Sequence, residues 1–205
     1  MTPKPATTEL EGQGEPAWEI AMLFPPQGAW SEGDYLALDT NRLVEFSAGR
    51  VEVLSMPTAK HQAIVAFLYM LLFALRSRVP GAVTFAPFPV RLWAGRFREP
   101  DLVFMRSAHN ARRHNEYWDG ADLVVEVVSG GTRDRQRDLV VKREEYAQAG
   151  IPEYWIVDPQ TETTTVLRLD NGVYVEHGQF GRGAVAVSAT LDGLETPVDA
   201  VFDAE

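Results

Sequence analysis

One carboxylate of this sequence lies where a carboxylate is costly. Glu126 stands in the middle of residues 123–128, a continuous apolar and β-branched run. Such a run predicts a central strand that is covered on both faces. An unpaired buried carboxylate costs several kcal/mol, so Glu126 must be neutral, paired with a cation or bound to a metal ion.

A second carboxylate has a related setting. Asp101 follows Pro100 directly and begins the short apolar run 101–105, which predicts another strand. Two carboxylates at the same end of neighbouring strands would hold a hard cation such as Mg²⁺ through oxygen. The alternative is that Asp101 and Glu126 each pair with a nearby arginine.

Several motifs together resemble a known family. They are Glu99-Pro-Asp101, then Leu-Val-Val-Glu126-Val-Val-Ser, then a Lys142-x-x-x-Tyr146-x-x-x-Gly helix end that runs into Ile-Pro-Glu-Tyr-Trp-Ile-Val-Asp-Pro. Upstream, Val-Glu45-Phe with a following glycine and a histidine at position 61 agree with the same pattern. The sequence resembles the Uma-type restriction-endonuclease-like family of the PD-(D/E)XK nuclease superfamily, from about residue 31 to 159 and more loosely beyond.

The resemblance implies a metal site. Asp101 and Glu126 would be the metal ligands, and the backbone carbonyl of Val127 would be a further oxygen ligand. The lysine that the wider superfamily has two residues after the glutamate is Val128 here. A lysine from the following helix is a plausible substitute, which gives this catalytic role to Lys142; the alternative is a solvated helix lysine.

Other residues of the pattern are candidates for supporting roles. Helical spacing places Asp138, Lys142 and Tyr146 on one helix face, and Tyr146 is an accessory candidate. Glu45, in a predicted hairpin, would be an additional catalytic carboxylate, or else an exposed strand residue. His61 would be an accessory residue, or simply a histidine at a helix start. Residues 129–132 lack a Walker pattern and indicate a strand-to-helix turn.

The elements that must position these residues follow from apolar spacing, caps and turns. A capping box at Ser31 predicts a short helix, and a hairpin is expected over 43–54. Further along the chain, we predict a largely buried helix over 58–78, one interrupted strand over 83–92, a strand over 101–105 and a polar loop over 107–121. After the strand over 123–128, we predict a helix over 134–149, a strand over 153–157 and an antiparallel meander from 164 to 187. The helix over 134–149 is expected to bury Leu139, Val140, Tyr146 and Ala149.

This order predicts an α/β fold, a restriction-endonuclease-like mixed sheet flanked by helices, with an N-terminal hairpin and a C-terminal antiparallel meander. Residues 1–17 are rich in Thr, Pro, Gly and Glu, without apolar periodicity, and are interpreted as a disordered leader. Residues 18–205 are interpreted as one domain, since no linker or repeat interrupts them.

Composition narrows the class of protein. The absence of cysteine excludes disulfides, thiolate zinc sites and a cysteine nucleophile, and it fits a cytoplasmic location. No apolar run is long enough to span a bilayer. The net charge is -10, but residues 91–143 hold eleven basic against eight acidic residues, whereas 151–205 hold two against ten. The middle of the chain is therefore a candidate surface for a polyanion; the alternative is that its arginines are scattered over the surface.

The predicted function is Mg²⁺- or Mn²⁺-dependent hydrolysis of phosphodiester bonds in nucleic acid, with DNA as the expected substrate. The alternative is a catalytically inactive nuclease-fold module that binds nucleic acid or protein. A homodimer is the expected assembly, because cutting two antiparallel strands suits two-fold symmetry. The strand-rich C-terminal part is one place for its interface.

Overall fold

A six-stranded mixed sheet forms the centre of the computed structural model, which describes residues 23–40 and 42–205, apart from the side chain of Arg133. The interpreted leader, 1–17, lies outside the described residues. The sheet has the order β11-β10-β9-β8-β6-β3, in which only β8 and β9 run parallel. Its strands are β3 (Gly81–Phe85), β6 (Leu102–Arg106), β8 (Leu123–Val127), β9 (Glu153–Asp158), β10 (Thr163–Asp170) and β11 (Val173–Phe180).

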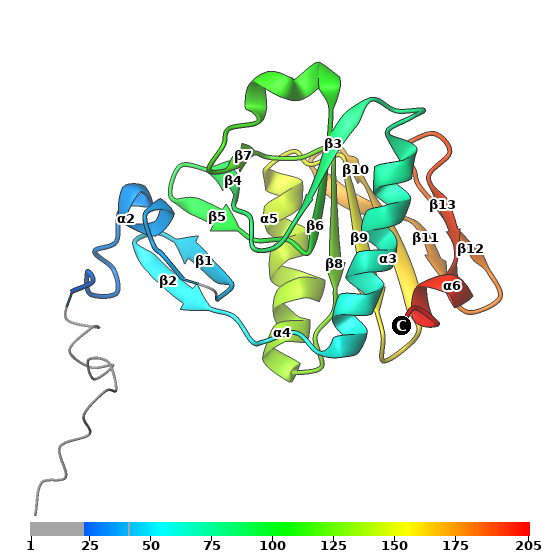
Figure 1. Ribbon diagram of the computed structural model, residues 1–205, viewed down its shortest axis with the longest axis horizontal. Helices are drawn as coiled ribbons and strands as arrows, with labels where there is room; N and C mark the ends of the chain where they lie inside the picture. The colour runs from blue at the N-terminus through cyan, green and yellow to red at the C-terminus, as the bar shows by residue number, and fades with distance from the viewer. Residues whose placement is uncertain (1–22, 41) are drawn as a thin grey trace, which may run out of the picture.

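Helices cover both faces of this sheet (Figure 1). On one face, α3 (Ala59–Leu75) packs apolar side chains against Phe104, Val125 and Trp155. On the other, α5 (Lys142–Gln148) packs Tyr146 and Ala147 into a cluster with side chains of β6, β8 and β9. All five residues of β8 are buried, which confirms the prediction of a central strand covered on both faces.

A second sheet lies beside the first, at the left of Figure 1. Its strands are β2 (Arg50–Val53), β1 (Val44–Ser47), β5 (Arg96–Arg98), β4 (Val90–Trp93) and β7 (Trp118–Asp119), in that order. The short helix α2 (Glu32–Leu36) begins at the predicted capping box and packs Tyr35 against Phe46 and Phe97. The hairpin β1–β2 confirms the expectation for residues 43–54.

The C-terminal part confirms the antiparallel strands and adds a helix. β10 and β11 extend the main sheet, whereas β12 (Val185–Val187) lies outside it and pairs with β13 (Glu195–Pro197). α6 (Val198–Phe202) follows and packs into the same apolar cluster as α3. Among the described residues, no helix combines the length and apolar character that crossing a bilayer requires.

The structure corrects four predictions about elements. Residues 83–92 form two strands rather than one: β3 ends the main sheet and β4 belongs to the second sheet. Pro87 and Pro89 separate them, because neither can donate a ladder hydrogen bond. The segment 107–121, predicted as a loop, contains the 3₁₀-helix η1 (Ser107–Arg112) and β7, the latter anchored by the buried Trp118.

The third and fourth corrections concern the helices. α3 buries one face only, because Met70 and Phe73 are exposed. The predicted helix over 134–149 is built from α4 (Thr132–Gln136), a π-helical turn (Arg137–Val141) and α5. Val140 is exposed rather than buried, and the buried face carries Asp138 and Lys142 instead. Apolar periodicity did not predict the buried face of this helix, because that face carries charged residues.

Candidate active site

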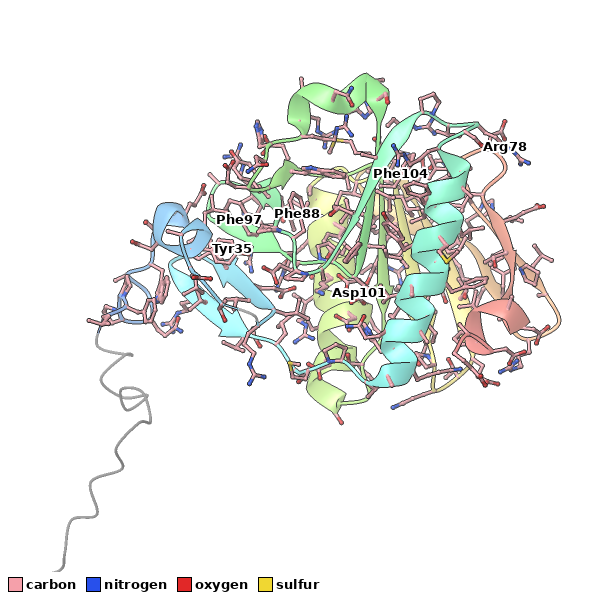
Figure 2. All side chains as sticks on the ribbon, viewed as in Figure 1. Tyr35, Arg78, Phe88, Phe97, Asp101 and Phe104 are labelled. Atoms are coloured by element: carbon pink, nitrogen blue, oxygen red, sulfur yellow. The ribbon has the colours of Figure 1, made fainter. Side chains whose placement is uncertain are left out.

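Asp101 and Glu126 meet at one end of the main sheet. Leu102 of β6 pairs with Val125 of β8 in antiparallel register, so the two carboxylates flank that pair at the same end. Both side chains line a cavity of about 30 Å³. That volume is sufficient for one or two species the size of water. Figure 2 labels Asp101 between the N-terminal half of α3 and the hairpin β1–β2.

Hydrogen bonds from two elements fix the Asp101 carboxylate. Its Oδ2 accepts the Val127 backbone N–H at 2.7 Å and lies 3.2 Å from Nε2 of His61. His61 lies in the first turn of α3, where its backbone N–H donates to the side-chain oxygen of the N-cap residue Thr58. Burial lowers the pKa of His61, but the hydrogen bond and charge of Asp101 outweigh it, so the pKa is raised. His61, the accessory candidate, also lines this cavity.

The Glu126 carboxylate is held from the opposite helix. Its Oε1 accepts from Lys142 Nζ at 2.8 Å and from the Tyr146 hydroxyl at 2.6 Å. Lys142 and Tyr146 are one helical turn apart, which is why both reach the same oxygen. Burial raises the pKa of Glu126, and the charges of Asp138 and Asp101 add to this rise while Lys142 opposes it. A divalent cation in the cavity would oppose it further.

Lys142 is a buried cation among carboxylates. Only 2% of the residue is exposed, which excludes the alternative of a solvated helix lysine. Its Nζ lies 2.8 Å from Glu126, 3.3 Å from Glu45 and 3.4 Å from Asp138. Burial lowers the pKa of Lys142, but the three carboxylates raise it above its usual value. Lys142 is therefore an ammonium at neutral pH and does not serve as a general base.

Glu45 occupies a different position from the other predicted carboxylates. It is buried on β1 and contacts Lys142 and Arg98, but it lines a separate groove and not the cavity of Asp101. The described residues contain no group of three His, Asp or Glu side chains arranged to hold a metal ion. Glu45, expected as an additional catalytic carboxylate, therefore does not share one ion shell with Asp101 and Glu126 in this geometry.

Sequence reasoning missed several charged residues around the cavity. Arg98 bridges Glu45 and Glu145, and Arg137 lies beside Asp138 at 3.5 Å. Glu99 accepts hydrogen bonds from the Val44 N–H and the Tyr35 hydroxyl, and burial raises its pKa to about 7. Arg98 and Glu99 contact residues far away in sequence, so no local pattern indicated them. Arg137 pairs with its near neighbours Asp134 and Asp138.

The donor set fits a hard divalent cation. All hydrogen bonds from described residues to Asp101 and Glu126 go to Oδ2 and Oε1, so the second oxygen of each carboxylate takes none. Asp138 Oδ1, at the same cavity, is buried without a hydrogen bond, although two cations lie within ion-pair distance. Mg²⁺ is bound through one or two carboxylates and keeps several waters, so two free carboxylate oxygens suffice.

A larger cavity adjoins this one. Its volume is about 460 Å³, and it is bounded by the start of α3 and the loop between β8 and α4. His61 and Ser129 line both cavities. The turn over 129–132 leads into α4 at Thr132, as predicted. The larger cavity has the size that small-molecule sites typically have.

Comparison with known proteins decides the family. The sequence matches the model of the Uma2 family, described as "Putative restriction endonuclease", over residues 33–199. The chain belongs to the Uma2 family. The match covers most of the chain and confirms the resemblance drawn from the motifs around Asp101 and Glu126.

A solved structure agrees with this Uma2 assignment at the level of the fold. It is described as a "putative nuclease belonging to DUF820 from Anabaena variabilis", and it superposes with a TM-score of 0.67 at 16% sequence identity. The match covers 85% of this chain and 98% of that chain. The restriction-endonuclease-like α/β fold is thereby confirmed. No curated protein matches the sequence.

Proposed function

We propose that this Uma2 protein is a metal-dependent endonuclease that hydrolyses phosphodiester bonds, with DNA as its substrate. Membership of a family described as "Putative restriction endonuclease" supports the nuclease class. The observation that carries the proposal is the pair Asp101 and Glu126, which lines one cavity with the ammonium of Lys142. Two carboxylates and a fixed cation are the groups that metal-assisted phosphodiester hydrolysis needs.

Asp101, Glu126 and the Val127 carbonyl would hold the divalent ion, Mg²⁺ or Mn²⁺. When bound, the ion supplies Lewis-acid polarisation of the phosphoryl oxygen. Lys142 contributes a permanent positive charge that stabilises the negative charge developing on the phosphoryl group. Tyr146 and Lys142 orient the Glu126 carboxylate, and His61 and the Val127 N–H orient Asp101. The adjoining cavity of about 460 Å³ has room for a nucleotide beside the scissile bond.

The decisive test is a cleavage screen of supercoiled plasmid, linear duplex, single-stranded DNA and RNA with Mg²⁺ or Mn²⁺. We expect cleavage of DNA by the parent protein and none by Asp101→Asn, which keeps the side-chain shape. Asp192→Asn, at an exposed position, is the matched control and should retain full activity. A folded parent protein that cuts none of these substrates, or an Asp101→Asn variant as active as the parent, would refute the proposal.

Metal binding is tested separately from cleavage. Titration of Mn²⁺ followed by electron paramagnetic resonance should show one site in the parent that is lost in Asp101→Asn and in Glu126→Gln. Nucleic-acid binding with no metal site and no cleavage would instead support the alternative, a non-catalytic nuclease-fold module.

We also propose that the protein acts as a homodimer, because a two-fold axis relates the antiparallel strands of a duplex. The edge strand β3 offers a surface for pairing: none of the residues of Gly81–Phe85 is charged, and it ends the main sheet. Light scattering that reports a monomer at high protein concentration would contradict this proposal.

A further inference from the structure

The buried guanidinium of Arg98 lies behind the candidate active site. Arg98 ends β5 and is 5% exposed. Its Nε and one terminal nitrogen donate to the two oxygens of Glu145 at 2.7 and 2.9 Å, and its other terminal nitrogen donates to Glu45. A planar guanidinium with a fixed fork of donors can bind two carboxylates in set directions.

Glu45 connects this guanidinium to Lys142. The Glu45 side chain is 1% exposed, and its Oε2 accepts from Arg98 while its Oε1 lies 3.3 Å from Lys142 Nζ. Oε1 receives no hydrogen bond of regular geometry from the described residues. Glu45 is therefore shared between two cations, firmly bonded to Arg98 and more loosely paired with Lys142.

The position of the Lys142 ammonium depends on this sharing. Lysine has a flexible four-carbon stem and a compact charge, so its surroundings decide where the charge lies. Glu126 attracts the ammonium toward the cavity, at 2.8 Å, and Glu45 attracts it from the far side, at 3.3 Å. If Arg98 did not hold Glu45, the free carboxylate would approach Lys142 and draw its ammonium away from Glu126.

We propose that Arg98 is a positioning residue: by holding Glu45 and Glu145, it keeps the Lys142 ammonium on the cavity side against Glu126. Glu45 then serves as a shared counter-ion of Arg98 and Lys142 and is not a metal ligand. This inference rests on the proposed function only for its catalytic consequence. The placement of Lys142 can be measured without any cleavage.

The test uses the ammonium itself as the probe. The sequence contains three lysines, Lys4, Lys60 and Lys142, of which Lys60 is exposed and Lys142 buried. In protein labelled with ¹⁵N-lysine, a hydrogen-bonded buried ammonium gives a ¹H–¹⁵N signal protected from solvent exchange. We expect one such signal in the parent, lost in Lys142→Met, which assigns it.

Arg98→Met should shift this signal or abolish its protection, and Arg98→Lys should do so in part. Arg96→Met is the matched control. Arg96 lies on the same strand and pairs with Glu145 at 3.3 Å, but it forms no ion pair with Glu45 among the described residues. Arg96→Met removes one positive charge, as Arg98→Met does, and should leave the Lys142 signal unchanged. If Arg98→Met does not fold, Arg98→Lys decides the question.

Cleavage gives the second readout. Arg98→Met should lower kcat by roughly tenfold to a hundredfold with little change in KM, as expected when a preorganised charge is displaced. A Lys142 signal in folded Arg98→Met or Arg98→Lys that is identical to that of the parent would overturn the proposal, whatever the activity. If the parent cleaves nothing, the signal still decides on Arg98 while the proposed function fails.

Discussion

At the scale of single residues, the candidate site consists of buried carboxylates paired with buried cations. Glu126 was suspected because its strand is apolar, and the structure gives its carboxylate the partners Lys142 and Tyr146. Helical spacing was enough to bring Lys142 and Tyr146 to one face. Arg98 carried no such signal, because it lies 53 positions from Glu45 and 47 from Glu145. Ion pairs between distant segments leave no local pattern in a sequence.

Removing the charge of Lys142 should affect stability as well as turnover. Lys142→Met leaves Glu126, Glu45 and Asp138 without their shared cation, and breaking a buried pair in this way costs about 3–5 kcal/mol. Turnover should fall by roughly 10² or more, because a fixed charge at the reaction centre is lost. Added Mg²⁺ should recover part of the stability, since it replaces one positive charge near Glu126.

Urea unfolding with and without Mg²⁺ measures the effect of Lys142→Met on the free energy of unfolding. A variant as stable as the parent without metal would mean that the three carboxylates are not charged together in the folded protein.

The hydroxyl of Tyr146 provides a test of the charge on Glu126. Tyr146→Phe removes a buried hydrogen bond of 2.6 Å to that carboxylate. Hydrogen bonds to charged groups contribute about 1.5–3 kcal/mol, against about 0.5–1.5 for neutral partners. Tyr174→Phe is the matched control, because its hydroxyl donates to the neutral Ile151 carbonyl at 2.8 Å. We expect the larger loss of unfolding free energy in Tyr146→Phe; equal losses would indicate a neutral Glu126.

At the scale of elements, the correct predictions are those of helices and strands that short-range patterns or apolar runs indicate. The capping box of α2, the first hairpin and the buried strand β8 all follow from short-range patterns. The second sheet was missed because its strands are short: β5 has three residues and β7 has two. Such strands have too few residues to show an alternating pattern, and only their pairing in space defines them.

The face of α3 that meets the sheet should dominate the stability of that element. Leu68 is 2% exposed and Met70, two residues on, is 71% exposed. Leu68→Ala should lower the free energy of unfolding by about 2–5 kcal/mol, because it leaves a cavity in the core. Met70→Ala should change it by less than about 0.5 kcal/mol. Thermal or urea denaturation distinguishes them, and comparable losses would show that the outer face of α3 is also covered.

At the scale of the whole molecule, many basic side chains between residues 91 and 143 are paired with carboxylates of the same protein. Ion pairs to carboxylates occupy the side chains of Arg91, Arg96, Arg98, Arg135, Arg137 and Lys142. Arg106 ends β6, at the opposite end of that strand from Asp101, and Arg112 ends η1; both donate to backbone carbonyls. The expectation that the middle of the chain meets a polyanion therefore has little support in the placement of these arginines.

Binding of nucleic acid should accordingly depend on the divalent ion more than on arginines. Each phosphate neutralised by a basic side chain adds about -0.9 to the slope of log affinity against log salt concentration. Among the described residues that line the two cavities, the lysine and arginine side chains besides Lys142 are Lys60 at the larger cavity and Arg137 at the smaller one. With so few cations there and a net charge of -10, the slope should have a magnitude of about 3 or less.

Fluorescence anisotropy of a labelled DNA duplex, measured from low to moderate salt, tests this expectation. Ca²⁺, a hard cation with the same preference for oxygen ligands, should strengthen binding, because it screens Asp101 and Glu126 from the phosphates. EDTA should weaken binding in the parent, whereas Asp101→Asn should be nearly indifferent to both additions. A steep slope of about -6 in EDTA would instead point to an extended basic surface, and the role assigned to the cavity in binding would then be wrong.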